Sequence, residues 1–200
     1  MVKVKSSSYN KGKAKKIIKK KKTKTKRKRK TFKVVDNLNL KIQRVESEQT
    51  TKDTEVYFAD IKNVYLKYIQ QSTYIAGCQA WLRDKDILKS LYEKKGVSIV
   101  VNNERIPKET KGIYDCLKSF CTKKAIHYIG NKRKRFSAIL HHKFLIGLDE
   151  DKKCQYVITG SYNLSENACN NLENIVVLKN PKVMELFCKE FKSIVDALED

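Results

Sequence analysis

Apolar residues recur along this chain with two different spacings, and the spacing predicts which segments are helices and which are strands. In two segments the apolar side chains stand three and four positions apart, as in a helix with one buried face. The first segment has Ile61, Val64, Tyr65, Tyr68 and Ile69, and the second has Ile87, Leu88, Leu91 and Tyr92. Asp60 and Asp84 precede these segments and are the expected N-caps of the two helices.

Shorter apolar runs predict strands, and a capping pattern predicts where the last helix begins. Strands are expected over residues 72–80, 97–101, 125–129, 139–148, 155–159 and 173–178. A third helix is expected over residues 111–121. Asn180 and Pro181 form an N-cap followed by proline at the first helical position, so a closing helix should start there. Its apolar residues keep a helical period: Met184, Phe187, Phe191, Ile194, Val195 and Leu198.

The alternation of helices and strands predicts an α/β fold with a mixed, mostly parallel sheet flanked by helices. The chain has 200 residues, 40% of them hydrophobic, which is enough to bury one sizeable core. We expect the folded domain over residues 54–200. Residues 1–53 are expected to be a basic arm and linker outside that domain.

Positive charge is concentrated at the start of the chain. The first 33 residues contain 17 Lys and Arg and no acidic residue, so most of the formal net charge of +22 comes from this segment. Because it repels itself and has few apolar residues, it is expected to be disordered on its own. Its charge density favours contact with a polyanion, above all nucleic acid, over a role in solubility alone. An anionic membrane surface would attract it as well.

Two basic runs are candidate nucleic-acid contacts. The first consists of Lys26, Arg27, Lys28, Arg29 and Lys30, and such a run is also typical of a nuclear import signal. The second consists of Lys132, Arg133, Lys134 and Arg135, within the folded part. No apolar signal-peptide core follows Met1, so we expect an intracellular protein that is not secreted, with the nucleus as a candidate location.

The residues best suited to chemistry lie near the predicted strand at 139–148. Alternate side chains of a strand share a face, so His141 and Lys143 should point the same way. His142 belongs to the other face with Phe144, and we expect it to be a buried, hydrogen-bonded histidine. A polar turn with Asn163 follows the next strand. A nucleophile, a cation and amide donors at one phosphate-sized spot are typical of a phosphodiesterase active site.

His141-x-Lys143 followed by Gly160-Ser161-x-Asn163 resembles the signature of the phospholipase D superfamily. The resemblance runs from about Thr54 to Leu198. It implies a phospholipase D-like fold, hydrolysis of phosphodiester bonds, and catalytic roles for His141, Lys143 and Asn163. Ser161 is expected to brace the turn or to donate one hydrogen bond.

The family signature also contains an aspartate after the lysine, and Asp149 is the candidate for that position. It stands one residue later than the family pattern, and a shift of one residue in a strand turns a side chain to the other face. A bulge at Gly147 would restore its direction. Without that bulge Asp149 is a hairpin-loop residue, and Glu173 becomes the candidate to hold the imidazole of His141 in its working tautomer.

The family uses two His-x-Lys half-sites and this chain contains one, so the resemblance implies a homodimer that completes one active site. One neutral His141 would attack phosphorus and form a phosphohistidine, while the second His141 protonates the leaving oxygen. No carboxylate cluster suited to a metal surrounds the signature, so neither a metal nor another cofactor is expected.

The signature alone does not separate nucleic acid from phospholipid, because both contain phosphodiesters. The basic arm and the second basic run favour an endonuclease acting on DNA or RNA. The alternative enzyme is a phospholipase acting on an anionic lipid such as cardiolipin. A third hypothesis is a catalytically silent nucleic-acid-binding protein of the same fold.

Overall fold

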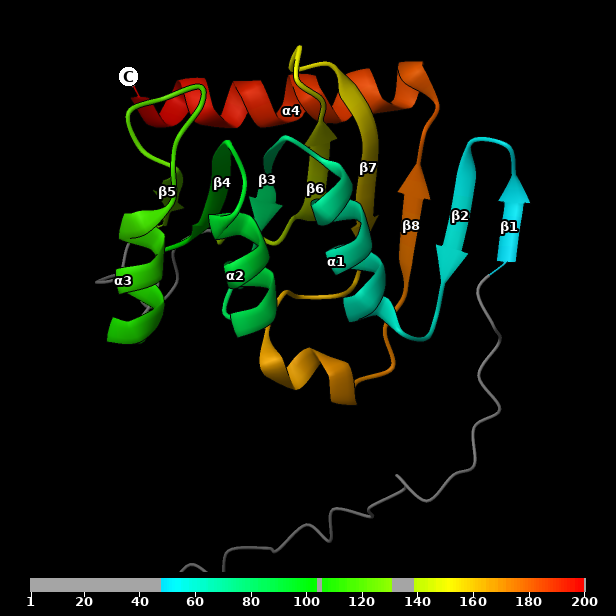
Figure 1. Ribbon diagram of the computed structural model, residues 1–200, viewed down its shortest axis with the longest axis horizontal. Helices are drawn as coiled ribbons and strands as arrows, with labels where there is room; N and C mark the ends of the chain where they lie inside the picture. Colours follow the sequence, from blue (N-terminus) through cyan, green and yellow to red (C-terminus); the bar gives the residue numbers. More distant parts are fainter. Residues whose placement is uncertain (1–47, 104–105, 131–138, 200) are drawn as a thin grey trace, which may run out of the picture. The chain divides into compact units, whose positions relative to one another are not determined.

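The computed structural model describes residues 48–103, 106–130 and 139–199, and these form one eight-stranded sheet with helices on both faces (Figure 1). The basic runs 26–30 and 132–135 lie outside the described residues. The strands are β1 (Glu48–Thr51), β2 (Thr54–Tyr57), β3 (Tyr74–Gln79), β4 (Gly96–Asn102), β5 (Ile126–Ile129), β6 (Lys143–Leu148), β7 (Cys154–Gly160) and β8 (Ile175–Leu178). The helices are α1 (Ile61–Gln71), α2 (Lys85–Tyr92), α3 (Lys108–Cys116) and α4 (Pro181–Glu199), with a 3-10 helix, η2, at Glu166–Asn170.

The sheet has the strand order β1-β2-β8-β7-β6-β3-β4-β5 and is mixed, as the sequence predicts. Its parallel part is smaller than expected. Among the described strands only β3 with β4 and β4 with β5 pair in parallel, and the other five pairings are antiparallel. The physical reason is connection length, because a short hairpin such as β6–β7 can join only antiparallel neighbours, whereas the segments containing α2 and α3 allow the chain to cross over.

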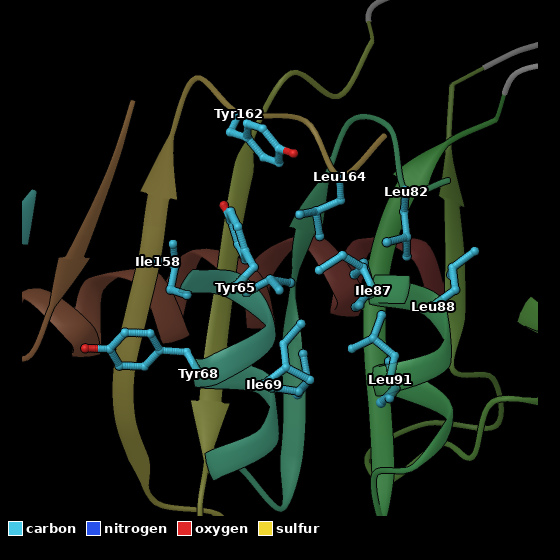
Figure 2. Close-up of a cluster of buried hydrophobic side chains, with 14 of the residues drawn as sticks. Tyr65, Tyr68, Ile69, Leu82, Ile87, Leu88, Leu91, Ile158, Tyr162 and Leu164 are labelled. Carbon is cyan, nitrogen blue, oxygen red and sulfur yellow. The ribbon is translucent and has the colours of Figure 1, made fainter. Parts of the chain in front are cut away.

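Helices α1, α2 and α3 cover one face of the sheet and α4 covers the other (Figure 1). The α1 stripe is confirmed, since all five of its predicted apolar residues are buried. Figure 2 shows Tyr65, Ile69, Ile87 and Leu91 between these helices and the strands. Tyr92 was expected on the same buried face, but it is 54% exposed. Successive side chains of a helix are rotated by about 100°, so Tyr92 points roughly 140° away from Ile87, at the margin of the buried face of α2.

Two of the three predicted helix caps are confirmed. Asp84 Oδ1 accepts hydrogen bonds from the backbone N–H groups of Asp86 (3.0 Å) and Ile87 (3.1 Å). Asn180 Oδ1 accepts likewise from the first turn of α4. Asp60 makes no side-chain cap, since its backbone is left-handed (φ 54°) and its carboxylate accepts from Asn63 Nδ2 at 2.6 Å instead.

Several element boundaries differ from the sequence prediction, and one difference affects the site. The strand expected over 139–148 begins only at Lys143, so the two histidines precede β6. Helix α3 starts and ends earlier than the expected 111–121. Strand β1 lies in a segment expected to be linker and pairs with β2. A histidine outside the strand can leave the core, because its backbone is not held in the sheet on both sides.

Gly147 marks the tightest packing in β6. A Cβ atom at this position would lie 2.1 Å from Tyr156 Cζ. The Tyr156 ring cannot move aside easily, since its hydroxyl donates to the backbone oxygen of Tyr68 at 2.6 Å and lies 2.7 Å from Ser72 Oγ. The register of β6 is therefore tied to a position that has no room for a side chain.

Replacing Gly147 with alanine should destabilise the fold by about 1–3 kcal/mol, because the added methyl group overpacks the core. Gly112 in α3 is the matched control, since a Cβ there meets nothing within 4 Å. Gly112→Ala should instead stabilise the helix by about 0.5–1 kcal/mol. Urea unfolding of both variants measures the difference, and equal midpoints would contradict the described contact between Gly147 and Tyr156.

Candidate active site

One edge of the sheet brings the signature residues together. The C-terminal ends of β3 and β7 and the N-terminal ends of β6 and β8 meet there, next to η2 (Figure 1). His141 lies two residues before β6 begins, Gly160 ends β7, and Glu173 lies two residues before β8. The antiparallel pairings thus unite residues that are up to about thirty positions apart in the chain.

Lys143 lies inside the protein although it carries a charge. It is the first residue of β6, stands opposite Gln79 of β3, and is 8% exposed. Its Nζ donates a hydrogen bond to the backbone oxygen of His141 at 3.0 Å. Burial lowers the pKa of Lys143 below its usual range, and the nearby Glu173 carboxylate acts in the opposite direction. The cation is therefore supported by a backbone oxygen and a neighbouring acid rather than by full hydration.

His141 and Lys143 meet at Trp81, a residue that is not part of the signature. The His141 ring lies edge-on to the indole with ring centroids 6.0 Å apart and planes at 88°. Lys143 Nζ lies 5.7 Å from the centroid of the same indole ring. His141 itself is exposed, so its ring is accessible to a substrate. The prediction that these two side chains converge agrees with this arrangement.

Gly160 and Ser161 make the turn that follows β7. A Cβ atom at Gly160 would lie 2.2 Å from the backbone oxygen of Asn174, so only glycine permits this close approach to the segment before β8. The Ser161 N–H donates to the same oxygen at 3.0 Å, and Ser161 Oγ accepts from the Asn174 N–H at 3.1 Å. Ser161 therefore braces the turn, which is one of the two roles expected for it.

Asn163 is held between two anchors. On one side Tyr162 stacks on Tyr65 with ring centroids 5.9 Å apart (Figure 2), and on the other the Leu164 oxygen accepts from the backbone N–H groups of Arg83 and Asp84. In the described part of the chain Asn163 Oδ1 is buried without a hydrogen-bond partner. Buried polar atoms without a partner are rare in folded proteins and call for an explanation. A substrate hydroxyl or N–H that donates to Oδ1 is one such explanation, whereas a phosphate oxygen could be bound only by the Nδ2 donor of the same amide.

Asp149 lies at the opposite end of β6 from His141. Its Oδ1 accepts from the backbone N–H groups of Asp151 (3.0 Å) and Lys153 (2.8 Å), so it closes the β6–β7 hairpin. A strand of six residues is about 20 Å long, which keeps this carboxylate away from the imidazole. The register does shift between Gly147 and Leu148, where a bulge was suggested, yet Asp149 stays in the turn. Asp149 is therefore a hairpin residue outside the candidate site, and Glu173 is the acid whose charge acts on Lys143.

The expectation that His142 is buried is wrong. Its side chain is 51% exposed, and its Nε2 lies 3.3 Å from Glu190 Oε1 on α4. The His142 ring packs against the Phe144 ring, with ring centroids 5.7 Å apart, at the edge of the core that α4 covers. His142 lies before β6 begins, so its side chain is on the same face as Phe144 but at the edge of the core and not inside it.

Asn102 is a second important residue outside the signature. Its Nδ2 donates to the backbone oxygens of Leu140 (2.8 Å) and Ala80 (3.2 Å), and its Oδ1 accepts from the Leu140 N–H at 2.8 Å. The buried amide thus holds the backbone next to His141. A signal was present in the sequence, since Trp81 and Asn102 follow the apolar runs of two parallel strands, and ligands commonly bind where the carboxyl ends of such strands meet.

Within residues 48–103, 106–130 and 139–199 no group of three or more His, Cys, Asp or Glu side chains is placed to hold a metal ion. In the same ranges no helix combines the length and the apolar character that crossing a bilayer requires.

Comparisons with known proteins agree with this geometry. A family model described as "Cardiolipin synthase, PLD-like domain" matches residues 65–195. An uncharacterized protein of Acanthamoeba polyphaga mimivirus is 30% identical over 79% of this chain and 71% of its own length.

Two solved structures share the fold. NucT from Helicobacter pylori has a TM-score of 0.56 at 15% identity, over 72% of this chain and 95% of that chain. The phospholipase D family member Nuc from Salmonella typhimurium has a TM-score of 0.51 at 22% identity, over 70% of this chain and 91% of that chain. Because the family model spans most of the folded part and includes His141, Lys143 and Asn163 at one edge of that shared fold, this chain belongs to the phospholipase D superfamily of phosphodiester hydrolases.

Proposed function

We propose that this protein is a metal-independent endonuclease that cleaves phosphodiester bonds of nucleic acid through a phosphohistidine at His141. The observation that carries the proposal is the pairing of an accessible imidazole with a buried cation. His141 is exposed, whereas Lys143, two residues later, is 8% exposed and shares Trp81 as a neighbour. A nucleophile open to substrate beside a desolvated positive charge suits attack on a phosphate anion.

In the first step a neutral ring nitrogen of His141 attacks phosphorus. The P–N bond forms as the bond from phosphorus to the leaving oxygen breaks, and the partner subunit's His141 gives that oxygen a proton. In the second step water attacks phosphorus, the P–N bond breaks, and the partner subunit's His141, now neutral, takes a proton from the water. Each histidine returns to its starting state, so no outside reagent besides water is consumed.

Lys143 and Asn163 would stabilise the negative charge that builds up on the phosphate oxygens. A buried ammonium group interacts with that charge in a low effective dielectric, which strengthens the attraction. The Asn163 amide is held in place by its neighbours before substrate arrives, so little reorganisation is needed. Glu173 supports the site by favouring the protonated form of Lys143.

A single chain offers one His141 and one Lys143, so the proposed mechanism needs a second copy related by a twofold axis. The edge that carries His141 has features that suit such a contact. Three exposed apolar residues, Phe58, Ile139 and Leu172, lie in the segments that lead to or from this edge. Their burial between two subunits would favour the dimer through the hydrophobic effect.

Charge supports nucleic acid as the substrate. The chain has a formal net charge of +22, and basic residues of the arm would neutralise backbone phosphates and release counterions. Hydrolysis of an anionic phospholipid is the second candidate, because the description of the family model that matches residues 65–195 names cardiolipin synthase. The basic run at 26–30 would also suit import into the nucleus, where nucleic acid is abundant.

Asn102 is a positioning residue in this scheme. Two of its three hydrogen bonds fix the backbone of Leu140, the residue before His141, and the third joins it to Ala80, directly after β3. A nucleophile displaced by about 1 Å can lose roughly two orders of magnitude in rate.

His141→Ala should abolish cleavage of single-stranded DNA, duplex DNA or RNA in the presence of EDTA, because the nucleophile is gone. His142→Ala is the matched control, one residue away and facing Glu190, and it should retain the wild-type rate. Gel assays with the three polymers, and a release assay with cardiolipin vesicles, identify the substrate. Loss of only the lipid signal would favour the phospholipase, and binding without cleavage by wild type would favour the silent protein.

Mixtures of wild-type and His141→Ala chains, unfolded and refolded together, test the shared site. If both copies of His141 are required, activity should fall as the square of the wild-type fraction, since mixed dimers are inactive. A linear fall would show that each chain works alone and would exclude the twofold mechanism.

Glu173→Gln should lower the pKa of the Lys143 ammonium group further below its usual range, because the carboxylate favours the charged form of the lysine. An NMR titration of the lysine side chains measures this change directly. Glu150→Gln, in the hairpin at the other end of the sheet, should leave the pKa of Lys143 in place. An unchanged pKa of Lys143 in Glu173→Gln protein would show that this carboxylate does not support the cation.

Asn102→Ala should lower kcat by about a hundredfold while KM for polynucleotide changes little, since the displaced group is the nucleophile and not the binding surface. Ser72→Ala is the control for lost stability, because Ser72 is also buried and hydrogen-bonded but lies at the far end of β3. If both variants lose kcat equally, the effect of Asn102 is on folding alone.

A further inference from the structure

A groove of about 480 Å³ opens beside the catalytic residues. Its lining includes Trp81, Arg83, Pro107, Thr110, Ser165 and Asn167. Trp81 follows β3 closely, Thr110 belongs to α3, and the last two residues follow the turn that carries Asn163. Two of the three segments that build the groove thus also carry or adjoin active-site residues, and the start of α3 supplies the third.

Trp81 lines the groove and also contacts His141 and Lys143. Its indole forms part of the groove wall, while the same side chain packs on the His141 ring at 6.0 Å and lies under Lys143 Nζ at 5.7 Å. A group bound against the groove side of Trp81 would therefore be a direct neighbour of a phosphate held by Lys143. The groove is placed to receive the part of a substrate adjoining the scissile bond.

Among the described residues that line the groove the charges cancel, which separates it from the phosphate site. Arg83 and Lys85 are matched by Glu109 and Glu166, and Lys85 Nζ lies 3.8 Å from Glu166 Oε1. A lining without net charge gives no selection for a second anion. The phosphate is therefore selected by the buried cation of Lys143, and the groove is left to select the group attached to that phosphate.

The other polar groups of the lining suit a flat, uncharged ligand. The hydroxyls of Thr110 and Ser165 and the amide of Asn167 can donate and accept hydrogen bonds. In the described part of the lining Trp81 and Pro107 form the apolar wall. An acyl chain would leave the polar groups without partners, whereas a nucleobase offers an aromatic face and a hydrogen-bonding edge.

We infer that this groove is a nucleobase subsite in which Trp81 stacks on the base next to the scissile phosphate. The inference rests on the proposed function, because it names the substrate portion that adjoins the phosphate at Lys143. It adds a selection for nucleic acid over phospholipid that the shared phosphodiester cannot supply. Stacking on an aromatic side chain accepts any of the bases, so cleavage should show little sequence preference from this contact.

Trp81 is the only tryptophan among the 200 residues, so its fluorescence reports on the groove without any substitution there. His141→Ala protein, which cannot form the phosphohistidine, is titrated with a single-stranded thymidine oligonucleotide, an abasic oligonucleotide of equal length and charge, and cardiolipin vesicles. The thymidine strand should quench Trp81 saturably and bind about tenfold more tightly than the abasic strand. The abasic strand should still bind through the basic residues, with little quenching.

Equal affinity and equal quenching by the two strands would overturn the subsite, and so would a saturable spectral shift with cardiolipin vesicles alone. Failure of the nuclease proposal would give a different result. Wild-type protein would then cleave no polynucleotide, whether or not the fluorescence of Trp81 responds to the base. If polynucleotide is cleaved but Trp81 ignores the base, the nuclease stands and the subsite falls.

Kinetics of substituted proteins give a second, independent readout. Trp81→Ala should raise KM for single-stranded DNA about tenfold, and Trp81→Phe should restore most of the loss because a phenyl ring also stacks. Tyr92→Ala is the matched control, an exposed aromatic at the end of α2. An unchanged KM in folded Trp81→Ala protein, judged by its urea midpoint, would overturn the inference.

Discussion

The antiparallel register of β6 between β3 and β7 decides which face of the sheet carries Lys143. Large side chains on both faces of β6 hold this register, with Leu145 in the core under α1 and α2 and with Phe144 and Ile146 in the core under α4. A slip of one residue would exchange these faces and turn Lys143 toward α4. Gly147 adds a second constraint on the register, because the space against Tyr156 has no room for the side chain of any other β6 residue. The chemistry of the site therefore depends on the packing of the core.

Burial of Lys143 has an electrostatic cost that the surrounding groups offset. Its neighbours come from different parts of the chain: the backbone oxygen of His141, the indole of Trp81 and the carboxylate of Glu173. Removal from water lowers the pKa of the ammonium group, and the nearby carboxylate opposes that effect. The result is a cation that is held still and poorly hydrated, which is the state in which it attracts a phosphate most strongly.

The sheet edge that carries His141 and Asn163 is joined by backbone contacts as much as by side chains. Leu82 and Leu164 form a parallel bridge, and the Leu164 oxygen accepts from the N–H groups of Arg83 and Asp84. Asn102 then connects the end of β4 to the segment before His141. These links connect the turn with Asn163, the groove beside Trp81 and the segment that carries His141. The proposed phosphate site and the proposed base site consequently share their walls.

Local features of the protein follow from the order of its residues: the apolar stripe of α1, the caps at Asp84 and Asn180, and the spacing that turns His141 and Lys143 toward the same side. Each depends on residues a few positions apart, whose relation is set by helix or strand geometry. Other features arise only in the folded domain, namely the largely antiparallel pairing, the exposure of His142, the distance of Asp149 from the site, and the roles of Trp81 and Asn102. These features depend on which strands become neighbours, and that choice is made by the burial of both faces of the sheet across the whole domain rather than by any short segment.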